Sequence, residues 1–144
     1  MEPIKKIKHL FMAYRNGIVA DTLRKAGINY SIIFGLQLPQ LSMIAREFEP
    51  DMNLAMQLWN DKNIRESRLL ACYLFPAEEL TEQQCIDLAE SLQTKEEADI
   101  LCFRLLRRLP FADKLADRLI MESASPLFAY CGEALIRNLE AIKQ

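Results

Sequence analysis

Apolar residues recur every three or four positions along most of the chain, and this spacing predicts amphipathic helices. From residue 51 onward the pattern divides into short segments separated by brief breaks. No strand is predicted, because valine is used once and the alternation typical of strands is absent. The helices predicted in this part of the chain cover residues 51–59, 63–74, 81–92, 94–109, 111–122 and 126–140.

Polar residues at the starts of these segments match helix N-caps. Asp51 and Thr81 each stand directly before a helical pattern. Residues 63–66 (NIRE) and 94–97 (TKEE) resemble capping boxes, in which the first and fourth side chains each bind a backbone N–H. Pro110 is expected to end the segment 94–109, because proline cannot continue a helix.

The segments pair into a repeat of about 30 residues. The first helices start near 51, 81 and 111, and their partners near 63, 94 and 125. Helix pairs at such an interval are typical of α-solenoids. We therefore predict an all-α fold, a right-handed α-α superhelix of antiparallel helix pairs. Small residues fall at equivalent places of the second helices, namely Cys72, Cys102 and Cys131.

The first 50 residues are less regular. They predict helices at 3–15, 18–26 and 39–48, with a loop over 27–38. The length of 144 residues is that of one domain, so we expect a single domain over 1–144, with irregular helices over 1–50 and three helix pairs over 51–144.

The charge and the numbers of histidines and cysteines exclude several classes of function. Eighteen basic and 20 acidic residues give a net charge of −2, so bulk positive charge does not hold a nucleic acid. His9 is the single histidine, and the four cysteines form no C-x-x-C pair, so we expect no metal and no cofactor. The thiols are expected to be reduced and buried. The longest uncharged run, 26–45, is too polar to span a membrane, which favours a cytoplasmic protein without membrane contact.

Three segments resemble a known family: residues 34–46 (FGLQLPQLSMIAR), 58–59 (LW) and 65–71 (RESRLLA). They are similar to bacterial DNA alkylation repair proteins of the AlkD type. The resemblance implies an array of HEAT-like repeats that holds duplex DNA and releases cationic N-alkylated purines. Members are commonly longer, so the chain is expected to be a short and catalytically divergent one.

The resemblance also implies a catalytic set of three residues. An aspartate falls on Asp99, a tryptophan four residues earlier falls on Lys95, and an arginine falls near Ala129 or Tyr130. A carboxylate would stabilise positive charge on the sugar, while a lysine would repel a cationic purine. We therefore expect Asp99 to be catalytic and the glycosylase activity to be lost or weakened. The alternative is that Asp99 complements the helix dipole and pairs with Lys95.

Basic residues gather in two places. Residues 101–120 carry five basic and two acidic side chains, and two more arginines lie at 65 and 68. Arginines of this kind bind phosphates or form a solvated face. The residues predicted to contact duplex DNA are Arg65, Arg68, Arg104, Arg107 and Arg108.

Two other functions stay open. A solenoid that lost the DNA chemistry could bind a protein partner instead, because a concave helical surface serves either role. The last helix also carries an apolar stripe with no helix after it, which would favour self-association if it is uncovered. The stripe consists of Leu127, Phe128, Tyr130, Leu135, Ile136 and Leu139.

Overall fold

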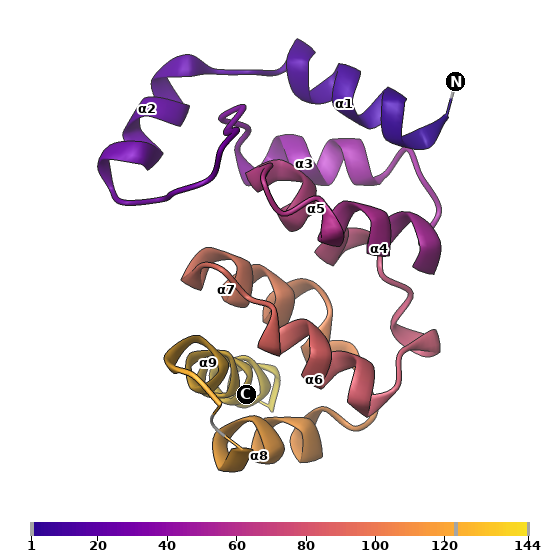
Figure 1. Ribbon diagram of the computed structural model, residues 1–144. Helices are drawn as coiled ribbons and strands as arrows, with labels where there is room; N and C mark the ends of the chain where they lie inside the picture. The colour runs from indigo at the N-terminus through magenta and orange to yellow at the C-terminus, as the bar shows by residue number, and fades with distance from the viewer. Residues whose placement is uncertain (1, 123, 144) are drawn as a thin grey trace. The chain divides into compact units, whose positions relative to one another are not determined.

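The computed structural model describes residues 2–122 and 124–143, and these residues form nine α-helices, two short 3-10 helices and no strand (Figure 1). Ile32 and Ile64 form one isolated parallel bridge. The all-α prediction is confirmed, while the handedness of a superhelix stays a prediction. No helix among the described residues is long and apolar enough to cross a membrane.

The chain divides into two compact units, Met1–Phe75 and Pro76–Gln144. The prediction of one HEAT-like repeat domain, with irregular helices over 1–50, stays a prediction. The first unit contains α1 (Pro3–Ala13), α2 (Gly17–Lys25), α3 (Leu38–Ala45), α4 (Met52–Asn60) and α5 (Arg65–Leu74). The second contains η1 (Ala77–Glu79), α6 (Glu82–Glu90), α7 (Lys95–Arg104), η2 (Leu106–Arg108), α8 (Ala112–Glu122) and α9 (Pro126–Lys143).

The helix starts reproduce the predicted interval. The first helices α4, α6 and α8 begin at Met52, Glu82 and Ala112, and the second helices α5, α7 and α9 begin at Arg65, Lys95 and Pro126. Each first helix therefore starts 30 residues after the one before it. The second helices are 30 and 31 residues apart, so the period holds with a shift of one residue.

Side-chain caps explain three of these starts. The Asp51 carboxylate accepts from the Leu54 N–H, and Thr81 forms a reciprocal capping box with Gln84. Thr94 accepts from the Glu97 N–H as predicted. The Glu97 carboxylate, however, accepts from the N–H of Gln93 instead of that of Thr94.

The predicted capping box at 63–66 is wrong. The N-cap of α5 is Ile64, which has no side-chain cap. The Glu66 carboxylate points elsewhere and accepts from the backbone N–H groups of Phe34 and Gly35. The Glu66 side chain, which the local pattern predicted to cap the start of this helix, instead binds a loop more than 30 residues earlier in the chain.

The core of the second unit forms around α9, which packs on α7 and α8. Cys85, Cys102 and Cys131 are buried there, and the Sγ atoms of Cys102 and Cys131 are 3.6 Å apart. With Cys72 in the first unit, all four cysteines are buried and none forms a disulfide, which agrees with the prediction of buried thiols.

Most of the apolar stripe of α9 is covered by other residues of the second unit. Phe128 and Leu135 are buried, and Leu127, Ile136 and Leu139 are half-buried where α9 packs on its neighbours. The stripe therefore needs no second copy of the chain to cover it. Self-association through the C-terminal helix stays a prediction without that support.

Candidate nucleic-acid interface

Asp99 lies exposed on α7, where it meets a side chain of α9. The Tyr130 hydroxyl donates a hydrogen bond of 2.8 Å to Asp99 Oδ1 across a sequence separation of 31 residues. This bond, with some desolvation and the charge of Asp99, raises the pKa of Tyr130 above its usual value of 10.0. The phenol therefore stays protonated at neutral pH and remains the donor to Asp99.

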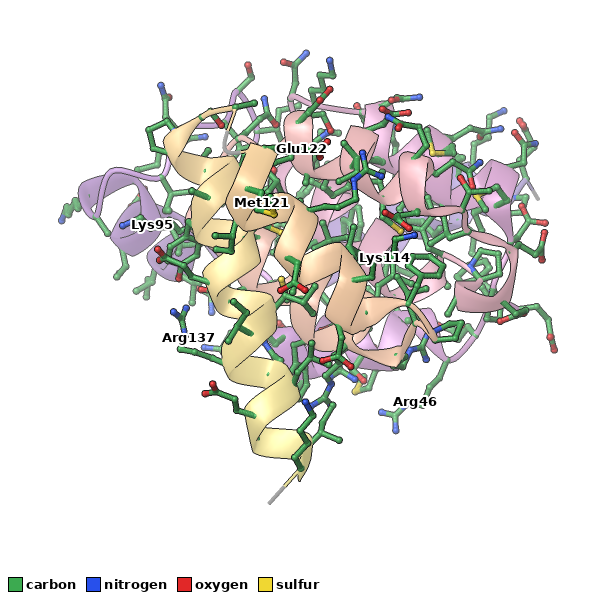
Figure 2. The ribbon with its side chains drawn as sticks, turned by 90° about the horizontal axis from the view of Figure 1, so that it is seen from below. Arg46, Lys95, Lys114, Met121, Glu122 and Arg137 are labelled. Atoms are coloured by element: carbon green, nitrogen blue, oxygen red, sulfur yellow. The ribbon has the colours of Figure 1, made fainter. Side chains whose placement is uncertain are left out.

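Two cations flank the Tyr130 ring. Lys95 Nζ lies 5.2 Å from the ring centroid and Arg137 Cζ lies 5.7 Å from it. Tyr130 and Arg137 are seven residues apart on α9, so they share one face of that helix. Figure 2 shows Lys95 and Arg137 projecting on the same side of α9. Lys95 thus lies against Tyr130, and none of the ion pairs among the described residues joins it to Asp99.

The remaining cations come from the end of α7 and from η2. The predicted helix 94–109 is interrupted, because Leu105 leaves the helical conformation and the chain tightens into the 3-10 turn Leu106–Arg108. The turn brings Arg107 Cζ to 3.9 Å from the centroid of the Phe103 ring, and Arg104 Cζ lies 5.4 Å from the same ring. Arg108 is exposed.

These side chains define what we call the α7–α9 surface. Lys95, Asp99 and Phe103 repeat at intervals of four along α7, so they share one side of the helix. The cations exceed the carboxylates there, although Glu133 is also exposed on α9. The α7–α9 surface consists of Lys95, Asp99, Phe103, Arg104, Arg107, Arg108, Tyr130 and Arg137.

Arg65 does not lie on a surface. It is 3% exposed, and its Nη1 donates to the Leu36 carbonyl at 2.9 Å and to Glu66 Oε2 at 2.7 Å. A guanidinium held inside the protein by a carboxylate and a carbonyl does not reach a phosphate. The predicted DNA contact of Arg65 therefore disagrees with its burial.

Arg68 needs the same correction. It is fully buried, its Nη1 donates to the Trp59 carbonyl at 2.7 Å, and its Cζ lies 3.8 Å from the Trp59 ring centroid. Arg68 thus serves the packing of α5 on α4, and its predicted DNA contact disagrees with its burial. Of the five arginines predicted to bind DNA, Arg104 and Arg107 lie against the Phe103 ring, and Arg108 is exposed on η2.

Sequence reasoning missed Arg137 and the aromatic partners of the cations. The seven-residue interval between Tyr130 and Arg137 was a usable signal, because it puts both on one helix face. The contact of Arg107 with Phe103 had a local signal as well, because the two residues are four positions apart, although α7 breaks at Leu105 between them.

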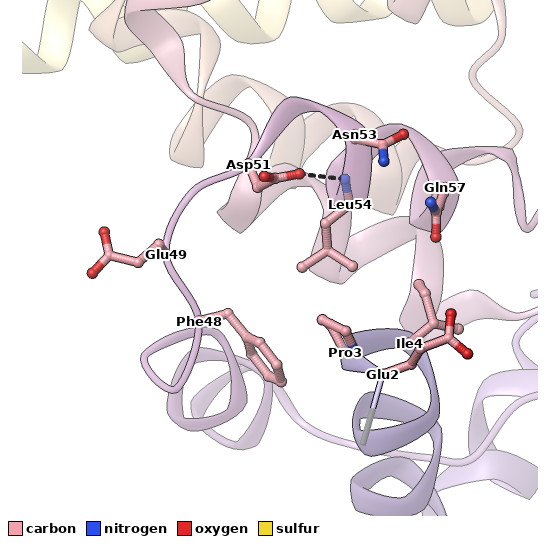
Figure 3. Close-up of a pocket in the computed structure, with 9 residues that line it drawn as sticks. All are labelled: Glu2, Pro3, Ile4, Phe48, Glu49, Asp51, Asn53, Leu54 and Gln57. Carbon is pink, nitrogen blue, oxygen red and sulfur yellow. Dashed lines mark hydrogen bonds between the residues drawn. The ribbon is translucent and has the colours of Figure 1, made fainter.

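A cavity of about 450 Å³ in the first unit has different chemistry (Figure 3). Among the described residues, its lining includes Glu2, Glu49 and Asp51 and contains no basic residue. The Asp51 carboxylate is occupied by the Leu54 N–H at the start of α4. Negative lining of this kind repels phosphate, so the cavity is not a nucleic-acid site.

The fold and the α7–α9 surface together define an all-helical protein with a basic, aromatic face beside an exposed carboxylate. Residues 7–124 match the DNA alkylation repair enzyme family, and the chain belongs to that family. This confirms the family resemblance of segments 34–46, 58–59 and 65–71. No curated protein and no solved structure matches the chain.

Proposed function

We propose that the chain binds duplex DNA through the α7–α9 surface. The observation that carries the proposal is the position of Lys95 and Arg137 against the Tyr130 ring beside Asp99, with Arg104 and Arg107 against Phe103 one turn further along α7. Cations on one face supply the sequence-independent affinity for phosphates that a net charge of −2 does not supply in bulk. Those cations are Lys95, Arg104, Arg107, Arg108 and Arg137.

We further propose that N-alkylpurine glycosylase activity is weak or absent. Asp99 is the carboxylate that would stabilise the positive sugar, but the Tyr130 hydroxyl already donates to it. Lys95 and Arg137 lie against the Tyr130 ring, which is beside this carboxylate. A cationic purine would have to displace one of two like charges to reach the aromatic face, so its binding is disfavoured.

Binding to a short duplex over a salt series tests the first part. If all five cations meet phosphates, log K falls against log salt with a slope of about −4.5, since each contact contributes about −0.9. Arg108→Ala and Arg137→Ala should each make the slope shallower by about 0.9. Lys114→Ala is the matched control, because Lys114 is an exposed cation of α8 that lies beside Glu82 and outside the surface.

The results of the salt series distinguish three cases: binding through this surface, binding elsewhere and no DNA binding. No binding at about 50 mM salt would refute the DNA proposal and favour a protein partner for this scaffold. Binding with equal slopes in all three variants would leave DNA binding but refute its assignment to the α7–α9 surface.

Release of an N-alkylated purine from the same duplex tests the second part. The expected rate is close to that of the spontaneous reaction, and Asp99→Asn should leave it unchanged. A rate well above background that Asp99→Asn abolishes would contradict weak activity and make Asp99 catalytic.

A further inference from the structure

Phe103 is an exposed aromatic ring on a helix that buries its other large apolar side chains. It is 44% exposed, whereas Leu101 is fully buried and Ile100 is 7% exposed. The Phe103 ring is therefore accessible to a ligand, to which it offers a large apolar and aromatic contact. The ring is one turn from Asp99 on the same side of α7, within the proposed DNA surface.

The surroundings of Phe103 are cationic instead of apolar. Arg107 lies over the ring at 3.9 Å and Arg104 at 5.4 Å, while Arg108 is exposed on the same short turn. The other exposed large apolar side chains of the second unit, Ile120, Met121 and Ile142, lie on α8 and α9. An apolar protein partner would gain one ring and would have to desolvate the arginines around it.

A nucleotide with an unpaired base fits both features at once. The base has a π-face that stacks on an aromatic ring or on a guanidinium, and its phosphates pair with the neighbouring arginines. A base inside an intact duplex is already stacked on its neighbours and offers only its edges. The ring is therefore useful to a nucleic acid only where a base has left the stack.

We propose that Phe103, with Arg107 stacked on it, is a platform for unpaired bases, so that the chain prefers DNA with unpaired nucleotides to intact duplex. This inference rests on the proposed function, because the same surface must first bind DNA. It adds a ligand class, namely gapped, bulged or single-stranded DNA, and a specificity-determining residue.

Fluorescence anisotropy with three DNA probes tests the platform. The probes are an intact duplex, the same duplex with one bulged nucleotide, and a single-stranded oligothymidine. Stacking of one base predicts about 5- to 150-fold tighter binding of the bulged duplex than of the intact one. Phe103→Leu keeps an apolar side chain but removes the π-face, so it should bring this ratio to about one.

Two control variants test whether the preference depends on the aromatic ring of Phe103. Phe103→Trp retains a π-face and should retain the preference. Met121→Ala removes an apolar side chain that is 83% exposed on α8 and should change no affinity (Figure 2). Circular dichroism melting of each variant checks that the helices remain folded.

The measured affinities test the platform, its assignment to Phe103 and the proposed DNA binding. Equal affinity for bulged and intact duplex in the unaltered chain would overturn the platform while leaving the proposed DNA binding in place. A preference that persists in Phe103→Leu would overturn the assignment to Phe103. Absence of binding to all three probes would refute the proposed function, and the platform with it.

Discussion

Glu66 holds a loop of the first unit through one fully buried carboxylate. Its Oε1 accepts from the Phe34 N–H at 2.9 Å, and its Oε2 accepts from the Gly35 N–H at 3.0 Å and from Arg65 Nη1 at 2.7 Å. The side chain thus joins α5 to residues more than 30 positions earlier. We predict that Glu66→Ala is among the most damaging substitutions in this unit.

The magnitude follows from what the substitution leaves behind. Removing one partner of a buried ion pair costs about 3–5 kcal/mol, because the Arg65 charge stays buried without its carboxylate. The two N–H groups lose acceptors as well, at about 1–3 kcal/mol each, but these costs overlap with the first. We expect a loss of about 4 kcal/mol for Glu66→Ala and a smaller loss of about 2 kcal/mol for Glu66→Gln, which retains an acceptor oxygen.

Urea unfolding followed by tryptophan fluorescence measures this loss. Trp59, the single tryptophan, is 2% exposed in the first unit and reports on that unit. Glu47→Ala is the matched control, because Glu47 forms an exposed pair with Lys6 at 3.6 Å that is worth at most about 1 kcal/mol. If Glu66→Ala costs no more than Glu47→Ala, the reasoning from the buried carboxylate is refuted.

Three further predictions concern other parts of the chain. Gly35→Ala should destabilise the first unit by at least about 2 kcal/mol in the same assay, because Gly35 has φ of +90° and an added Cβ would meet the Asn16 carbonyl; an unchanged midpoint would contradict this. The raised pKa of Tyr130 means that its protonated hydroxyl stabilises the fold. Tyr130→Phe should therefore lower the free energy of unfolding below about pH 10, and this loss should disappear at higher pH. A loss of stability that grows with pH would contradict this. Cys85, whose pKa burial raises to about 12, should react with an aromatic disulfide reagent at about pH 8 only after unfolding, and fast reaction of the folded chain would exclude this environment.

The helical architecture was predictable because local signals carried it. Asp51, Thr81 and Thr94 each cap a helix through their own side chain within three residues, and such contacts depend on little else. The interval of 30 residues between first helices followed from the same starts. The ends of helices were less accurate, since α7 stops at Arg104 while its apolar pattern continues to Leu109.

Charged residues with distant partners were not predictable. Arg65 and Arg68 read as surface cations, because charged side chains are rarely buried unless they are paired. Their partners include the Leu36 carbonyl, the Glu66 carboxylate and the Trp59 carbonyl, which belong to three different segments of the first unit. One sequence gives no means of knowing which buried carbonyl or ring will receive a guanidinium.

The candidate site was predictable in part. Asp99 came from the family resemblance, and the arginines of residues 104–108 came from local charge. The hydrogen bond from Tyr130 to Asp99 spans 31 residues and depends on how α7 and α9 pack. The contacts of Tyr130 with Asp99 and Lys95 therefore depend on the tertiary structure, whereas those of Arg137 with Tyr130 and of Arg107 with Phe103 join residues seven and four positions apart.

The most direct test of DNA binding through the α7–α9 surface is an NMR titration of the ¹⁵N-labelled chain with a short DNA duplex at about 50 mM salt. DNA binding through the α7–α9 surface predicts that the backbone amides of residues 95–108 and 127–137 shift most, because these segments contain the residues of that surface. Shifts confined to residues 2–75, or to α6 and α8, would contradict it.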